Sequence, residues 1–210
     1  MLGSFQQGNV AVTLSAPAMN KFISCVCFIL ALVTGSAAFW MHMKSIVGQV
    51  LLSQAWQNTL ESGKSHRAWP WADTWPVAEL ELPKSEKSWV ILEGVSGEAM
   101  AFGPGRVSSS SMTASAGTYV IGGHRDSHLN FLEHVAIGET LRLHTADGAK
   151  TRYRISELFI ADSDLGPLNL PKNMHALVLI TCYPFNALQT GGPLRYVVIA
   201  VPEEETSLSV

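Results

Sequence analysis

One uninterrupted apolar segment near the start of the chain most constrains what this sequence can fold into. Residues 22–41 read FISCVCFILALVTGSAAFWM and contain no Asp, Glu, Lys or Arg. As an α-helix rising about 1.5 Å per residue, they would extend over about 30 Å, the hydrocarbon thickness of a bilayer. We therefore expect a single transmembrane helix, and the 210 residues leave room for one further domain.

A cleaved signal peptide is the main alternative for this segment. Its apolar region would be shorter and followed by small residues, and residues 35–38 (GSAA) partly fit that pattern. Phe39 and Trp40 extend the apolar run beyond them, and tryptophan is typical of the membrane interface. We therefore favour an uncleaved anchor over a signal peptide or a buried helix of a soluble core. Lys21 and Lys44 flank the segment on both sides, so the positive-inside rule gives little orientation.

Charge and cysteine content narrow the function. Lys and Arg number 14 against 17 Asp and Glu, and the absence of a basic stripe excludes nucleic-acid binding driven by counterion release. Cys25 and Cys27 lie two residues apart in the apolar segment, where a helix points them away from each other; we interpret them as apolar filler. Cys182 is then the only thiol of the remaining chain, and it is either buried and inert or reactive.

Around the anchor we expect a disordered cytoplasmic tail over residues 1–20, the transmembrane anchor over 21–43 and a helical stalk or linker over 44–66. The stalk is predicted because apolar residues recur at roughly helical spacing before the break at Ser62-Gly63; these are Val47, Val50, Leu51, Ala55 and Leu60.

From about Trp75 onward the pattern changes to short apolar runs between turn residues. Asp147-Gly148 marks a hairpin, and the runs cover residues 89–92, 118–121, 141–144, 153–155, 176–181 and 196–201. The last two runs are continuously apolar, which predicts strands buried on both faces. Many short strands with few helical stretches indicate an all-β barrel or sandwich.

Three of these strands bear a chemically competent residue at or near one end. Cys182 ends the run ALVLITC, and Pro184 soon after it cannot continue a strand ladder. His124 follows the run TYVI and two glycines, and Arg195 opens the last strand. Each alone is more commonly structural, but together they supply a nucleophile, a proton carrier and a permanent cation. That set suits acyl transfer through a thioester.

The motifs around these residues resemble the sortase family. Residues 179–182 (LITC) resemble its LxTC signature, and Arg195 follows 13 residues later, as in that family. Residues 123–126 (GHRD) are similar to the segment around its catalytic histidine, and residues 181–185 (TCYPF) to a variant of the class D-like and Gram-negative proteobacterial branches. Residues 69–74 (WPWADT) and 101–105 (AFGPG) extend the resemblance, which covers about residues 67–202.

This resemblance implies a β-barrel of about eight strands with short helices over residues 67–203, followed by a tail over 204–210. It also implies a transpeptidase that cleaves an LPxTG-like sorting signal through a Cys thioester and transfers the acyl group to an amine. Cys182 would attack, His124 would act as acid and base, and Arg195 would stabilise the oxyanion. Thr181 and Asp126 would support the site. The catalytic domain would lie outside the cytoplasm, in the periplasm, anchored in the inner membrane through residues 22–41.

The expected partners are a substrate protein with a C-terminal sorting signal and an amine acceptor. We expect no cofactor. A metal site at His124, Asp126, His128 and His134 is not favoured, because the helical zinc pair with a catalytic Glu is absent. Two alternatives stay open. One is a membrane-bound cysteine endopeptidase that hydrolyses the same thioester, and the other is a non-catalytic β-domain that binds extended peptides at a sheet edge.

Overall fold

The computed structural model describes residues 16–111, 113, 117–166, 168, 175–187 and 191–203. Most of the expected N-terminal tail and the whole of the tail over 204–210 lie outside the described residues. The chain divides into two compact units, Met1–Ile46 and Val47–Val210, and each is considered by itself.

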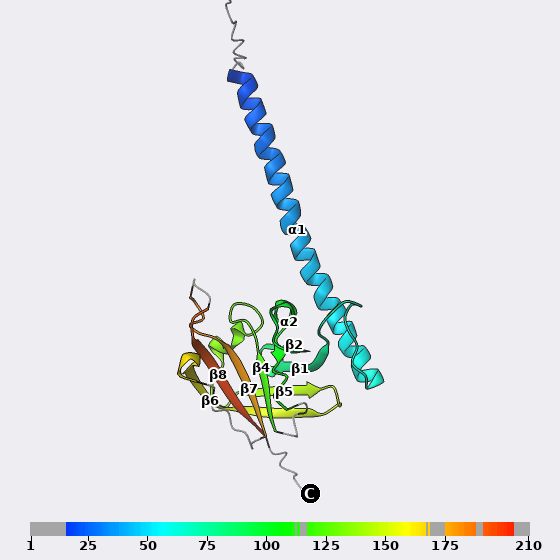
Figure 1. The fold of residues 1–210 in the computed structure, drawn as a ribbon, viewed down its shortest axis with the longest axis vertical. Coiled ribbons are helices and arrows are strands. Elements are labelled where there is room, and N and C mark those ends of the chain that lie inside the picture. Colours follow the sequence, from blue (N-terminus) through cyan, green and yellow to red (C-terminus); the bar gives the residue numbers. More distant parts are fainter. Residues whose placement is uncertain are drawn as a thin grey trace, which may run out of the picture. The chain divides into compact units, whose positions relative to one another are not determined.

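The first described element is the long helix α1, Ala16–Ser62 (Figure 1). It begins at Ala16, so residues 16–20 of the expected tail are part of this helix. Within it, Met19–Trp40 is long and apolar enough to cross a membrane, with a mean hydropathy of 2.3. Hydroxyl groups inside this segment bond to the helix itself: Thr34 Oγ1 donates to the Leu30 carbonyl at 2.8 Å. By length and composition alone, a signal sequence would pass the same test.

The last turns of α1 belong to the second unit and are not a free stalk. Leu52, Ala55, Trp56 and Thr59 are buried, at the spacing of one helix face. Trp56 Nε1 donates to Glu79 Oε2 at 3.2 Å. The buried face agrees only in part with the one expected from the sequence, because Ala55 is buried whereas Val47 and Val50 are exposed. The helix ends as predicted before Gly63, which takes a positive φ of 68°.

Eight strands form the closed barrel that the sequence predicted, in the order β1-β2-β3-β4-β7-β8-β6-β5. The strands are β1 Pro76–Leu82, β2 Lys87–Glu93, β3 Gly105–Arg106, β4 Thr118–Gly122, β5 Thr140–Thr145, β6 Lys150–Asp162, β7 Ala176–Cys182 and β8 Leu194–Pro202. The expected short helices are α2 Gly97–Phe102 and the 3-10 turns η1 Pro83–Ser85, η2 Asn130–His134 and η3 Ser163–Leu165. Strands β1 and β3 were not predicted as individual elements.

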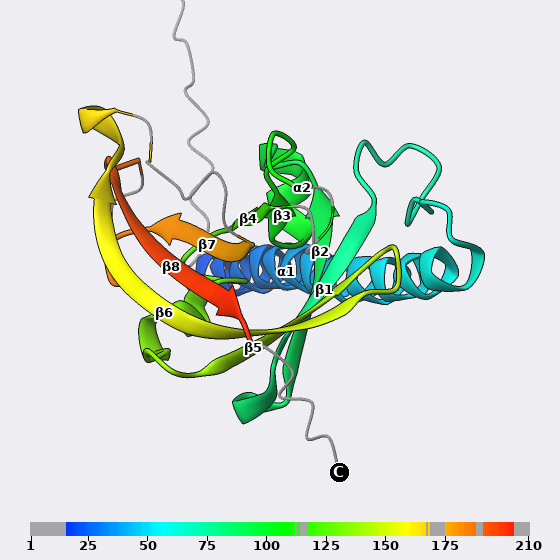
Figure 2. The ribbon, with the colours of Figure 1, turned by 90° about the horizontal axis from the view of Figure 1, so that it is seen from below.

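Strand β6 closes the barrel. Its first residues pair with β5 and the remainder pairs with β8, and Figure 2 shows how strongly it curves between these neighbours. The ladder with β8 changes register between Ile155 and Glu157, an irregularity that lets a strand bend. The sequence predicted only residues 153–155 of β6, since its mostly half-buried second half lacks a simple alternation of apolar and polar residues.

Two apolar clusters lie on opposite faces of β4, β7 and β8. Leu177 and Leu179 belong to the barrel interior, together with Tyr119, Val198 and Ala200. The alternate residues pack into a second cluster that contains Val120, Ala176, Val178, Val197 and Ile199. Strands β7 and β8 are therefore buried on both faces, as predicted. The second cluster lies on the outer face of these strands, which is also the face of the candidate site.

Candidate active site

Cys182 is the last residue of β7 and is half-buried. Successive side chains of a strand alternate between faces, so Cys182 shares the face of Val178 and Ile180, away from the barrel interior. The chain leaves the sheet directly afterwards, although the Tyr183 amide still donates to the Leu194 carbonyl at 3.0 Å. The thiol therefore lies on the outer face of the sheet at the end of a strand, where solvent and a ligand can reach it.

Arg195 is the direct cross-strand partner of Cys182 in the antiparallel ladder of β7 and β8. Side chains of such a pair leave the same face, with Cβ atoms about 4.5–5.5 Å apart. The guanidinium of Arg195 donates through Nη1 to the Gly192 carbonyl at 2.6 Å and to the carbonyl of the preceding residue, Leu194, at 3.0 Å. The fold thus brings this predicted cation beside the predicted nucleophile.

His124 follows β4, which pairs with β7 on the side opposite β8, and it lies at the same height along the sheet as Cys182. Gly122 pairs with Ile180 in the parallel ladder, and His124 stands two residues beyond Gly122 as Cys182 stands two beyond Ile180. The Gly123 amide donates to the Ile180 carbonyl at 3.2 Å, which continues the pairing past the strand end. The imidazole is exposed.

A cavity of about 210 Å³ joins these elements. Its lining residues are His124, Arg125, Asp126, Cys182 and Gly191. Cys182 and His124 thus border one space, together with the exposed residue Asp126. Arg195 borders this region through its pairing with Cys182 and is not among the described lining residues. Arg125, which the sequence analysis did not assign to the site, takes a place there.

A hydrogen bond between Thr181 and Gly123 links β7 to the segment that follows β4, next to the cavity. Thr181 is buried, on the interior face of β7, and its hydroxyl donates to the Gly123 carbonyl at 2.7 Å. A Cβ on Gly123 would lie 2.8 Å from the Leu129 Cγ, so this position requires glycine. The Leu129 amide in turn donates to the His124 carbonyl at 3.0 Å. The backbone around His124 is therefore closely held.

His128, on the same loop as His124, is half-buried. Burial lowers its pKa below the usual value of 6.5, the nearby His124 lowers it further, and the backbone of Ala101 opposes this. The lowered pKa favours the neutral form of His128. It was weighed in the sequence only as a metal ligand, because nothing in the pattern indicates its burial.

The aromatic residues that follow Cys182 form a cluster with Tyr196. Its ring lies 6.2 Å from Tyr183 and 5.2 Å from Phe185, measured between centroids. Burial raises the pKa of Tyr196, and the neighbouring Tyr183 adds to this. These contacts explain why an aromatic-rich TCYPF segment follows the strand: it packs the start of the β7–β8 connection against the barrel.

Comparison with known proteins places this arrangement in a family. The family model described as "Sortase domain" matches residues 80–203. Sortase D of Bacillus subtilis (strain 168) is 29% identical over 119 residues, which are 57% of this chain and 60% of that protein. The chain therefore spans less than two thirds of the length of this curated relative.

Solved structures agree with the fold. A sortase D5 transpeptidase of Clostridium perfringens superimposes with a TM-score of 0.54 at 21% identity, covering 75% of this chain and 98% of that one. Sortase A of Corynebacterium diphtheriae gives a TM-score of 0.53 at 20% identity, covering 64% of this chain and 63% of the other. At these identities the likeness establishes the barrel fold.

Proposed function

This chain belongs to the sortase family, and we propose that it is a membrane-anchored cysteine transpeptidase with Cys182, His124 and Arg195 as its catalytic residues. The observation that supports the proposal is the single cavity of about 210 Å³ that both Cys182 and His124 line. Arg195, the cross-strand partner of Cys182, supplies a permanent positive charge beside it.

In the proposed first half-reaction, the Cys182 thiolate attacks the carbonyl carbon of a bound peptide. Arg195 stabilises the oxyanion through N–H groups of its guanidinium other than those that bond to the Gly192 and Leu194 carbonyls. The C–N bond then breaks, and the imidazolium of His124 gives its proton to the departing amine. The product is a thioester between Cys182 and the N-terminal part of the peptide.

In the second half-reaction, an incoming amine gives its proton to His124 and attacks the thioester carbonyl. The C–S bond breaks, and the new amide leaves while Cys182 returns as the thiolate beside the imidazolium. The substrate we propose is a protein with an LPxTG-like sorting signal, cleaved between Thr and Gly. The chemistry needs no cofactor, since sulfur, imidazole and guanidinium supply every group that the two steps use.

The same proposal places the anchor in the inner membrane and the barrel in the periplasm. A membrane-impermeant maleimide tests this on intact spheroplasts, because Cys182 is the only cysteine outside the apolar segment. We expect labelling at Cys182, and labelling only after lysis would contradict the periplasmic location.

A peptide-transfer assay tests the reaction itself. The detergent-solubilised full chain is mixed with an LPxTG-like peptide, with and without an added amine such as triglycine, and the products are identified by mass spectrometry. We expect a new amide product that depends on the amine. Free acid alone under both conditions would indicate an endopeptidase, and peptide binding without any cleavage would indicate a non-catalytic β-domain.

A further inference from the structure

Two arginines hold the connection between β7 and β8 at two separate points. Arg125 Nη2 donates to the Ala187 carbonyl at 2.9 Å, and Arg195 Nη1 donates to the Gly192 carbonyl at 2.6 Å. Gly191, which lies between these points along the chain, lines the cavity shared by Cys182 and His124. The two described parts of the connection, residues 183–187 and 191–193, are thus each bonded to a guanidinium group.

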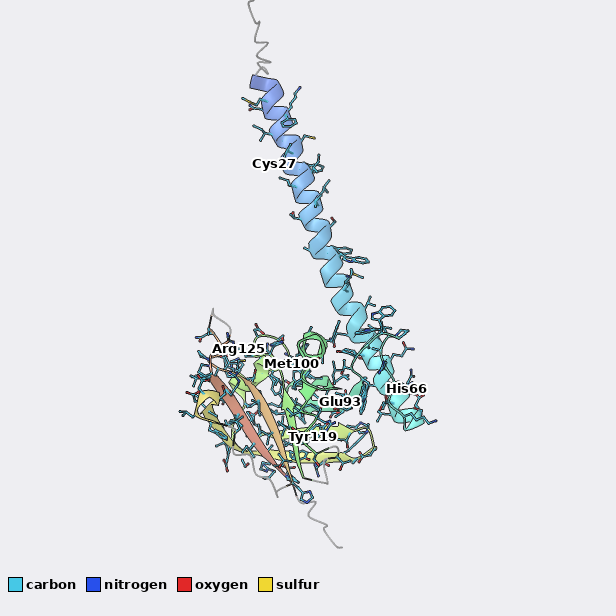
Figure 3. All side chains as sticks on the ribbon, in the orientation of Figure 1. Cys27, His66, Glu93, Met100, Tyr119 and Arg125 are labelled. Carbon is cyan, nitrogen blue, oxygen red and sulfur yellow. The ribbon has the colours of Figure 1, made fainter. Side chains whose placement is uncertain are left out.

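The two arginines differ in exposure. Arg125 is only 8% exposed, although His124 and Asp126 on either side of it are exposed. Burying a cation is unfavourable unless it is hydrogen-bonded, so this inward position is stable only with acceptors such as the Ala187 carbonyl. Figure 3 shows Arg125 at the end of the barrel where β7 ends and β8 begins. Arg195 is half-buried and lies beside the thiol.

We propose that Arg125 is a positioning residue that holds the β7–β8 connection at Ala187, next to the substrate cavity. It acts through the Ala187 carbonyl, whereas the reacting atoms meet His124, Cys182 and Arg195. This inference rests on the proposed function only in taking the cavity as the substrate site.

The division of roles between the two arginines follows from their contacts. Within the described part of the chain, Arg195 reaches the Gly192 and Leu194 carbonyls through Nη1 alone, so its other N–H groups can meet an oxyanion. Arg125 is buried and bonds to the Ala187 carbonyl near the other end of the connection, so its role is to hold the backbone there. Loss of the Arg125 bond therefore weakens substrate binding more than it slows the chemical step.

Hydrogen exchange of the full chain in detergent tests this proposal. Arg125→Gln removes the charge at similar length, and Arg125→Lys keeps a donor without the planar fork. We expect amide exchange in residues 183–194 to rise about tenfold in Arg125→Gln, the loss expected when a charge-assisted hydrogen bond is removed. A smaller rise is expected in Arg125→Lys.

Steady-state kinetics with an LPxTG-like peptide give a second readout. In Arg125→Gln, KM should rise by a larger factor than kcat falls, and Arg125→Lys should recover part of this loss.

Arg106→Lys is the matched control. Arg106 is also buried, at 4% exposure, but it bonds to Glu93 and to the Ser110 and Ser111 carbonyls. Arg106→Lys should raise amide exchange near Glu93, Ser110 and Ser111. It should leave the amide exchange of residues 183–194 as in the wild type. If Arg125→Gln does not fold, as judged by its thermal transition, the same measurements on Arg125→Lys test the proposal.

Two results would overturn the proposal. The first is unchanged exchange in residues 183–194 of the Arg125 variants. The second is a fall in kcat at constant KM, which would assign Arg125 to the reacting atoms themselves. Exchange requires no turnover, so an inactive wild-type chain would overturn the proposed function while leaving the test of Arg125 intact.

Discussion

Cys182 and Arg195 face each other directly across the antiparallel ladder of β7 and β8. A shift of one residue in this register would move Arg195 beside Thr181 and turn one side chain of the pair to the opposite face. The shift is prevented by the hydrophobic pattern of β8, in which Val198 and Ala200 point into the barrel while Val197 and Ile199 join the second cluster. The packing that stabilises the barrel therefore also places the guanidinium beside the thiol.

Replacing Thr181 tests the hydrogen bond that links it to Gly123, next to His124. Thr181→Val keeps the shape of the side chain but removes the hydroxyl that donates to the Gly123 carbonyl. We expect the free energy of unfolding to fall by about 1–3 kcal/mol, because a buried carbonyl loses its partner. We also expect kcat/KM to fall about tenfold, because the backbone before His124 is displaced. Thr181→Ser keeps the hydroxyl and should stay close to the wild type; equal activity of the two variants would contradict this role.

The close contact at Gly123 predicts a second effect. In Gly123→Ala the new methyl group would lie 2.8 Å from the Leu129 Cγ, so the loop that carries His124 has to move. We expect a destabilisation of about 1–3 kcal/mol, measured by urea unfolding, together with a loss of peptide transfer. Gly192→Ala is the control, since a Cβ there meets no atom within 4 Å. The account of this contact fails if both alanine variants behave alike.

The packing of the last turns of α1 predicts that Trp56 stabilises the catalytic unit. Trp56 is 1% exposed, donates to Glu79 and meets the ring of His144 edge-on at 5.5 Å between centroids. Trp56→Ala should lower the free energy of unfolding by about 3–5 kcal/mol. Trp71→Ala removes the same side chain where it is 80% exposed and should change stability by less than about 0.5 kcal/mol. A cost for Trp56→Ala as small as that of Trp71→Ala would mean that this segment is a free linker.

His128 predicts a pH dependence of stability. Burial lowers its pKa in the folded chain below the usual 6.5, so between these values the unfolded chain binds more protons than the folded chain. Stability is therefore fully present above about pH 6.5 and decreases as the pH falls toward the lower folded pKa. Burial also lowers the pKa of His144, which contributes with the same sign.

Urea unfolding between about pH 7.5 and 5.5 checks this prediction in His128→Gln. The variant should lose less stability on acidification than the wild type, with the remainder due in part to His144. His134→Gln, at an exposed position, should retain the wild-type slope. Identical slopes for His128→Gln and the wild type would contradict the buried neutral state of His128.

The apolar runs predicted the best-marked strands and an all-β barrel or sandwich, and the resemblance to sortases implied the barrel. The sequence did not predict β1 as an individual element, although Ala78, Leu80 and Leu82 alternate with polar residues there. The two-residue strand β3 is too short for any periodic signal. The buried face of α1 was predicted only in part: Ala55 is buried as expected, but Leu52 and Trp56 are buried in place of the equally apolar Val47 and Val50.

For the site, sequence motifs indicated which side chains end the strands but not how the strands pair. The parallel pairing of β4 with β7 and the register of β7 with β8 bring His124, Cys182 and Arg195 to one end of the sheet. Arg125 was missed as a contributor because a charged residue in a loop is expected to be exposed. Its burial follows from the tertiary position of Ala187, 62 residues away along the chain.

The most direct test of the account is whether Cys182 forms a thioester with a cleaved peptide. The detergent-solubilised full chain is incubated with an LPxTG-like peptide in the absence of an amine, and the intact mass and the modified residue are determined. The account predicts an increment equal to the N-terminal peptide fragment on Cys182, its release as a new amide when an amine is added, and its absence in Cys182→Ala. A wild-type chain that never carries the fragment, or an adduct that persists in Cys182→Ala, would contradict it.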